Sequence, residues 1–132
     1  MAKLNLMAAA LLTAAVPLVA SCAPAGSSEP LAGKVPGEPM RCLPSYRTNQ
    51  TIRVSDNILL YRSGGNLVYR NDLKSSCPGL ARDSDIMVVR QFGSSTCEGD
   101  FFHLVDRSSG IRGPTCVFGE FVPYRKPEGD KG

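Results

Sequence analysis

The stretch that decides the fold is residues 50–70, which read QTIRVSDNILLYRSGGNLVYR. Polar and apolar side chains alternate over residues 50–55, and this alternation predicts a half-buried β-strand. Two further strands are expected at residues 58–62 and 66–70, on either side of a turn at Ser63-Gly64-Gly65. Because glycines supply the positive φ that tight turns require, this pair of strands is predicted to form a β-hairpin.

The chain beyond this hairpin continues as short apolar segments separated by Gly, Pro and Ser. The expected segments are a loop at residues 71–80, a buried strand at 85–92, a strand at 100–106, a loop at 107–113 and a last strand at 115–122. Six short strands with no long helical pattern predict an all-β domain. We expect a small antiparallel barrel or sandwich.

Four cysteines lie within the predicted domain: Cys42, Cys77, Cys97 and Cys116. An even number in a small exported domain predicts two disulfides, with three pairings possible. The pairing of Cys42 with Cys77 and of Cys97 with Cys116 is favoured, because each bridge then closes a compact local segment. A metal site is the alternative, but close Cys-x-x-Cys spacing is absent and there is one His, so we expect no metal and no cofactor.

The first 21 residues have the layout of a secretory signal peptide, with Lys3 before an apolar run. The run ends in Val19-Ala20-Ser21-Cys22, which resembles the lipobox of bacterial lipoproteins. That resemblance implies cleavage before Cys22 and its acylation, for example by palmitate. Ala23 follows where inner-membrane lipoproteins commonly carry Asp, which implies the periplasmic face of the outer membrane. An ordinary signal peptide cut nearby is the alternative.

Composition divides the rest of the chain into three parts. Residues 22–40 hold Cys22 and a Pro- and Gly-rich flexible tether, residues 41–124 form the β domain, and residues 125–132 form a disordered tail. The domain is short enough to need disulfide staples. The whole chain of 132 residues carries a net charge of only +3, which excludes an electrostatic nucleic-acid binder.

The sequence contains no recognisable catalytic constellation. His103 is the only histidine and alternates with Phe101 and Val105, so we interpret it as a half-buried strand residue. A Cys–His nucleophile pair needs a free thiol, and the oxidising periplasm favours disulfides. Asp83 and Asp85 lie beside arginines and are interpreted as a charge-balanced edge rather than a cation site.

Tyrosine and arginine recur together at the ends of the two hairpin strands. The candidate binding surface consists of Tyr61, Arg62, Tyr69 and Arg70. Tyr and Arg are enriched at binding hot spots, and the hairpin brings the two pairs near one another. The alternative is that the tyrosines pack while the arginines keep the strand edge soluble.

Several short motifs follow one another in a fixed order. They are Arg41-Cys42, Tyr69-x-Asn71-x-Leu73, Cys77-Pro78-Gly79-Leu80, Cys97-Glu98-Gly99-Asp100 and Cys116-Val117-Phe118-Gly119-Glu120-Phe121. Through them the chain resembles an uncharacterised family of short proteobacterial lipoproteins, classed as a domain of unknown function. The resemblance implies export and a small disulfide-bearing fold, and it supplies no catalytic residues.

Together these features predict a non-enzymatic lipoprotein of the outer membrane that binds or supports an envelope partner. Its expected partners are the membrane, through the lipid anchor, and an envelope protein. The alternative function is inhibition of a secreted hydrolase such as lysozyme, with residues 106–113 as the inhibitory loop. A hydrolase or redox enzyme is the third hypothesis, and it needs a free thiol or a perturbed pair of acids in a cleft.

Overall fold

The computed structural model describes residues 29–129, which form ten short β-strands and two 3-10 turns. In chain order these are η1 (Glu29–Leu31), β1 (Val35–Pro36), β2 (Cys42–Pro44), η2 (Ser45–Arg47), β3 (Gln50–Arg53), β4 (Ile58–Arg62), β5 (Val68–Asp72), β6 (Asp85–Val89), β7 (Ser95–Cys97), β8 (Phe101–Asp106), β9 (Arg112–Val117) and β10 (Phe121–Arg125). Within this range there is no helix that is both long and apolar enough to cross a membrane.

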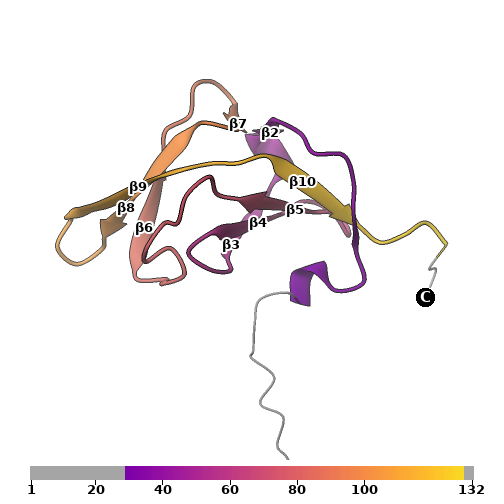
Figure 1. Cartoon of the computed structure of the whole chain (residues 1–132), viewed down its shortest axis with the longest axis horizontal. Helices are drawn as coiled ribbons and strands as arrows, with labels where there is room; N and C mark the ends of the chain where they lie inside the picture. Colours follow the sequence, from indigo (N-terminus) through magenta and orange to yellow (C-terminus); the bar gives the residue numbers. More distant parts are fainter. Residues whose placement is uncertain (1–28, 130–132) are drawn as a thin grey trace, which may run out of the picture.

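The strands form three antiparallel sheets (Figure 1). Five strands are arranged in the order β1-β10-β5-β4-β3, three in the order β6-β8-β9, and β2 pairs with β7. The predicted all-β antiparallel fold is therefore confirmed. None of these sheets closes into a barrel, because β3 and β6 end their sheets as edges that do not pair with one another.

The two larger sheets share one hydrophobic core. The five-stranded sheet contributes Leu59, Tyr61 and Tyr69, and the three-stranded sheet contributes Phe102 and Leu104. Phe121 of β10 also belongs to the five-stranded sheet, and Phe118 lies in the segment that joins the two sheets, where its ring centroid is 4.9 Å from that of Phe102 and 6.1 Å from that of Phe121. Burial of these large apolar side chains supplies most of the driving force for folding.

The predicted hairpin is present, with one change in its turn. β4 spans the predicted residues 58–62, whereas β5 begins at Val68 instead of residue 66. The turn is longer because the Ser63 amide donates to the Leu67 carbonyl at 3.0 Å, so Asn66 and Leu67 belong to it. Gly65 has a φ of 71°, the left-handed conformation that the glycines were expected to provide.

The prediction that residues 115–122 form one last strand is wrong, because two strands share this range. β9 ends at Val117 and β10 begins at Phe121, so the chain leaves the three-stranded sheet and joins the five-stranded one between them (Figure 1). Gly119 is at this crossing. A Cβ there would collide with the Asp72 carbonyl oxygen, so only glycine fits. The preceding loop is also shorter than predicted, because β9 already begins at Arg112.

The folded part extends beyond both predicted boundaries of the domain. Val35, in the predicted tether, pairs with Arg125, in the predicted tail. The Gly37 amide also donates to the Pro123 carbonyl at 2.7 Å. Short strands such as β1 gain their hydrogen bonds from a partner distant in sequence, which composition does not indicate. The predicted signal peptide and Cys22 lie outside the described residues.

The two predicted disulfides are present, but the favoured pairing is wrong. Cys42 is bonded to Cys97, and Cys77 to Cys116. The reason is the pairing of β2 with β7, which puts Cys42 directly opposite Cys97 with their Cα atoms 3.9 Å apart. Cys77 and Cys116 are fully buried in the core. The argument from compact local loops failed because the sheets join segments that are far apart in sequence.

Candidate binding surface

The predicted surface of tyrosines and arginines is divided between the inside and the outside of the protein. Tyr61 and Tyr69 are direct cross-strand partners, and only 8% and 2% of their surfaces are exposed. Burial raises the pKa of the Tyr61 hydroxyl. Arg62 is exposed, while Arg70 forms a bidentate ion pair with Asp72 at 2.8 Å. The tyrosines therefore pack in the core, as the alternative interpretation expected, and the four residues do not form one surface.

The three-stranded sheet instead presents an apolar face on the side opposite the core. Met87 and Val89 pack against the core, so the alternating residues Ile86 and Val88 of β6 face outward, with 44% and 36% of their surfaces exposed. The predicted buried strand over residues 85–92 ends at Val89, and none of its residues is fully buried, because Met87 and Val89 are half-buried and Ile86 and Val88 are exposed. Phe101 of β8 is 37% exposed. We define the outer apolar face by the side chains of Ile86, Val88, Phe101 and Val105.

His103 lies among these side chains, opposite Val88 in the ladder, but it exposes too little surface to belong to the face. It is more buried than predicted, with 7% of its surface exposed. Its Nδ1 is 3.1 Å from Nη2 of Arg112. A guanidinium only donates, so Nδ1 accepts and the neutral ring carries its hydrogen on Nε2. Loss of hydration, together with the nearby charges of Arg112 and Arg90, lowers the pKa of His103.

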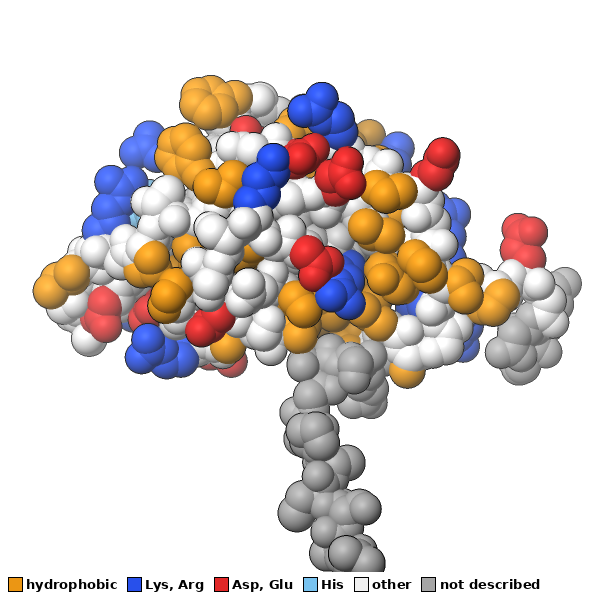
Figure 2. Space-filling view, in the orientation of Figure 1, with side chains coloured by type: hydrophobic (Ala, Val, Ile, Leu, Met, Phe, Trp, Pro, Cys, Tyr) orange, Lys and Arg blue, Asp and Glu red, His pale blue; other side chains and the backbone are white. Residues whose placement is uncertain are grey.

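Arginine side chains border the outer apolar face. Neither Arg90 nor Arg112 forms an ion pair with any residue in the described range. Figure 2 shows Lys, Arg, Asp and Glu side chains beside hydrophobic ones at the end of the molecule formed by β8 and β9. The outer apolar face therefore combines apolar contact area with two arginines that form no ion pair within the described residues.

In the loop at residues 106–113, the acidic side chain of Asp106 is hydrogen-bonded to residues of the same loop. The Asp106 carboxylate accepts hydrogen bonds from the side chains and backbone amides of Ser108 and Ser109, at 2.6 to 3.0 Å. These bonds, led by that from the Ser108 hydroxyl, lower the pKa of Asp106 to about 2. The carboxylate is thus occupied by the turn. The large apolar side chain that the loop presents is Ile111, which is 68% exposed.

Asp83 and Asp85 lie beside a contact between the two larger sheets that uses backbone carbonyls rather than their carboxylates. The Arg53 guanidinium donates to the carbonyls of Arg82 and Asp85 at 3.0 and 2.8 Å, and thereby joins the two larger sheets. Asp83 is exposed nearby. In residues 29–129, no group of three or more His, Cys, Asp or Glu side chains is arranged to hold a metal ion.

Comparison with protein-family models, with curated proteins and with solved structures found no match. The sequence did not reveal the outer apolar face, because residues 86–89 are apolar at every position and the pattern does not show which of them face outward. The available signal was the pair of charged residues, Asp85 and Arg90, that bounds this segment and is typical of a sheet edge.

Proposed function

We propose that this protein is a non-enzymatic, lipid-anchored protein of the bacterial envelope that binds a protein partner through its outer apolar face. The observation that carries this proposal is the exposure of Ile86, Val88 and Phe101 on one side of a single sheet. Contiguous apolar patches on a protein surface commonly mark interaction sites.

The charges around this face define the chemistry of the partner. Arg90 and Arg112 border the apolar side chains without a carboxylate partner in the described range. Arginine is enriched at interface hot spots, and complementary charge selects the partner. The expected partner is therefore an envelope protein whose surface presents apolar side chains bordered by Asp or Glu.

Support for the lipid anchor comes from the sequence before the described residues. Val19-Ala20-Ser21-Cys22 resembles a lipobox, and Ala23 favours the outer membrane. Two or three acyl chains hold a protein firmly, at about 0.8 kcal/mol for each buried methylene. The Cys22→Ser variant is expected to remain uncut and to incorporate no palmitate analogue. Labelling of that variant would contradict the anchor.

The partner is identified by photocrosslinking in living cells. A photoreactive amino acid at position 88 is expected to crosslink an envelope protein through a peptide rich in apolar and acidic residues. Position 35 gives a matched control, because Val35 is also an exposed strand valine, 50% exposed, outside the outer apolar face. Crosslinks of equal yield from both positions, or a crosslink from position 88 to a second copy of this chain, would contradict the proposal.

The alternative function, inhibition of a secreted hydrolase, is favoured by a single observation. Ile111 is exposed in the turn between β8 and β9, at one end of the long axis of the molecule (Figure 1). An inhibitor of this kind would insert that turn into the cleft of the hydrolase. Crosslinks to a hydrolase from position 111, with none from position 88, would support it over the first proposal.

A further inference from the structure

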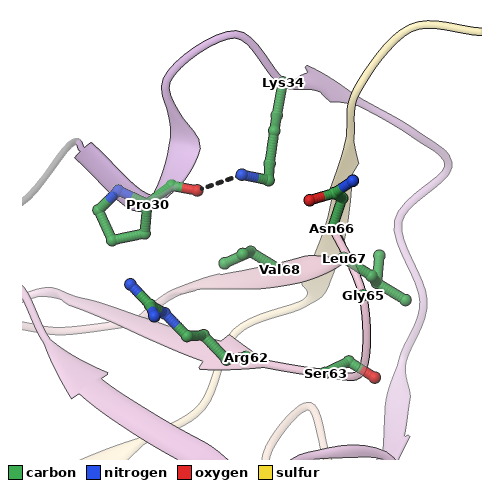
Figure 3. A pocket seen from close by; sticks show the side chains of 8 residues that line it. All are labelled: Pro30, Lys34, Arg62, Ser63, Gly65, Asn66, Leu67 and Val68. Atoms are coloured by element: carbon green, nitrogen blue, oxygen red, sulfur yellow. Dashed lines mark hydrogen bonds between the residues drawn. The ribbon is translucent and has the colours of Figure 1, made fainter. Parts of the chain in front are cut away.

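The turn of the β4–β5 hairpin is surrounded by basic side chains. We define the basic rim as Lys34, Arg62, Arg125 and Lys126. A hollow of about 420 Å³ on one side of the turn is lined by Lys34 and Arg62, together with Pro30 and Asn66 (Figure 3). A second hollow of about 340 Å³ on the other side is lined by Arg125 and Lys126. No acidic side chain lines either hollow.

Two of these cations come from separate elements and meet at the same hollow. Figure 3 shows Lys34 on the segment between η1 and β1, and Arg62 at the end of β4. The Lys34 ammonium donates to the Pro30 carbonyl at 2.8 Å, which holds it beside the hollow. Within the described range, none of the four basic residues forms an ion pair. Glu128 lines a different hollow with Arg125 and Lys126.

The position of the basic rim in the chain relates it to the anchor. Pro30 and Lys34, which form one wall of the hollow, come shortly after Glu29, the first described residue. Glu29 follows Cys22 by seven residues, and seven residues span at most about 25 Å. An acyl group on Cys22 would therefore keep the basic rim close to the lipid headgroups.

We propose that the basic rim binds the phosphates of anionic lipids in the membrane that holds Cys22. This inference rests on the lipid anchor of the proposed function. Val68 follows the hairpin turn and pairs with Tyr124 near the end of β10, while the turn between β8 and β9 lies at the opposite end of the molecule (Figure 1). Contact through the basic rim thus directs the β8–β9 end away from the membrane.

Physical chemistry favours lipid phosphates as the ligand of this surface. Four cations without an acid at either hollow attract anions, and each Lys or Arg near an anionic membrane increases binding about fivefold. The turn itself exposes Gly64, Gly65 and Asn66, so no large side chain separates its backbone from a flat surface. A membrane of anionic lipids is such a surface.

The test is hydrogen exchange on the chain purified from membranes and reconstituted into vesicles. In vesicles that contain phosphatidylglycerol, exchange at residues 63–67 is expected to be at least about fivefold slower than in phosphatidylcholine vesicles. Added salt should remove the difference because it screens the charges. Arg62→Gln and Lys34→Gln should each reduce it. Arg107→Gln is the matched control, since Arg107 is exposed in the distant β8–β9 turn, and it should leave the difference unchanged.

Three outcomes would overturn the inference. The first is equal hydrogen exchange at residues 63–67 in both vesicle types. The second is an equal effect of Arg107→Gln and Arg62→Gln. The third is slower exchange when inorganic phosphate is added to phosphatidylcholine vesicles, which would indicate a site for free phosphate. The intact mass of the same sample reports acylation separately. An unacylated chain would refute the anchor, and its exchange when mixed with each vesicle type would still test the basic rim.

Discussion

At the scale of single residues, the side chain of Asn71 in β5 connects this strand to Gly119, in the segment between β9 and β10. Its side chain is fully buried, accepts from the Gly119 amide at 3.1 Å and donates to the Gly119 carbonyl at 2.8 Å. Both residues belong to the ordered short motifs, Asn71 to the one that begins at Tyr69 and Gly119 to the one that begins at Cys116. The arrangement gives those motifs a structural role, because it holds the crossing from β9 to β10.

Replacement of Asn71 should therefore be costly. Asn71→Leu leaves the buried amide and carbonyl of Gly119 without partners, and is expected to lower the free energy of unfolding by about 2–3 kcal/mol. The control is Asn66→Leu in the exposed hairpin turn, with an expected change within about 0.5 kcal/mol. Urea unfolding measures both. Equal midpoints for the two variants would contradict the role of Asn71.

His103 should make stability depend on pH. Its pKa in the folded protein lies below the ordinary value of 6.5, so the unfolded chain binds the proton more readily. The free energy of unfolding should fall as the pH drops below that value, and His103→Gln should remove this slope. Asp106, with a pKa of about 2 instead of 3.8, contributes in a separate, more acidic range. A slope that persists in His103→Gln would assign it to another group.

The same variant also tests whether His103 belongs to the binding contact. We expect His103→Gln to leave crosslinking from position 88 intact, because the ring is largely buried and exposes little surface to a partner. Loss of the crosslink with an unchanged unfolding curve would place the imidazole in the interface.

At the scale of elements, the two disulfides differ in their environment. Cys42 is exposed on the two-stranded β2–β7 sheet, whereas Cys77 and Cys116 are fully buried. Mild reductant under native conditions is expected to open Cys42–Cys97 first, with Cys77–Cys116 opening only on unfolding. Alkylation followed by peptide mass spectrometry measures the order. Simultaneous labelling of all four cysteines would contradict it, as would a free thiol before reduction.

The sequence predicted some elements well and others not at all, for a reason that depends on length. β4 and β8 carry five or six residues with apolar positions that a pattern can detect, and both were predicted within one residue. β1, β2 and β7 have two or three residues each, too few for any periodicity. Their partners lie far away in the sequence, so tertiary pairing alone defines them.

At the scale of the whole molecule, the candidate binding surface was harder to predict from the sequence than the strands were. Alternation correctly puts Tyr61 and Arg62 on opposite faces, but it does not say which face another sheet will cover. The packing of the three-stranded sheet buries the tyrosines and leaves Val88 outside. That outcome depends on how two sheets meet, which is information distributed over the entire chain.

The proposed membrane contact and partner contact lie at opposite ends, and so should act independently. Arg62→Gln is expected to leave crosslinking from position 88 unchanged, and Val88→Glu should leave hydrogen exchange at residues 63–67 unchanged. Distant sites without shared partners usually behave additively. Both measurements on the double variant check this. A change in the crosslink caused by Arg62→Gln would mean that orientation at the membrane controls partner binding.

The pairing of β1 with β10 has a mechanical consequence under the proposed anchor at Cys22. Tension from the membrane would enter the fold at Glu29 and peel β1 from β10 first, since that contact consists of two residue pairs. Peeling would next separate Met40 from Phe121, and it would stop at Cys42, where the covalent bond to Cys97 transfers the force to the body of the domain. The released residues 29–41 extend to about 45 Å. The domain would thus lengthen under strain by a fixed amount, losing the contact of Met40 with the core while the outer apolar face stays intact.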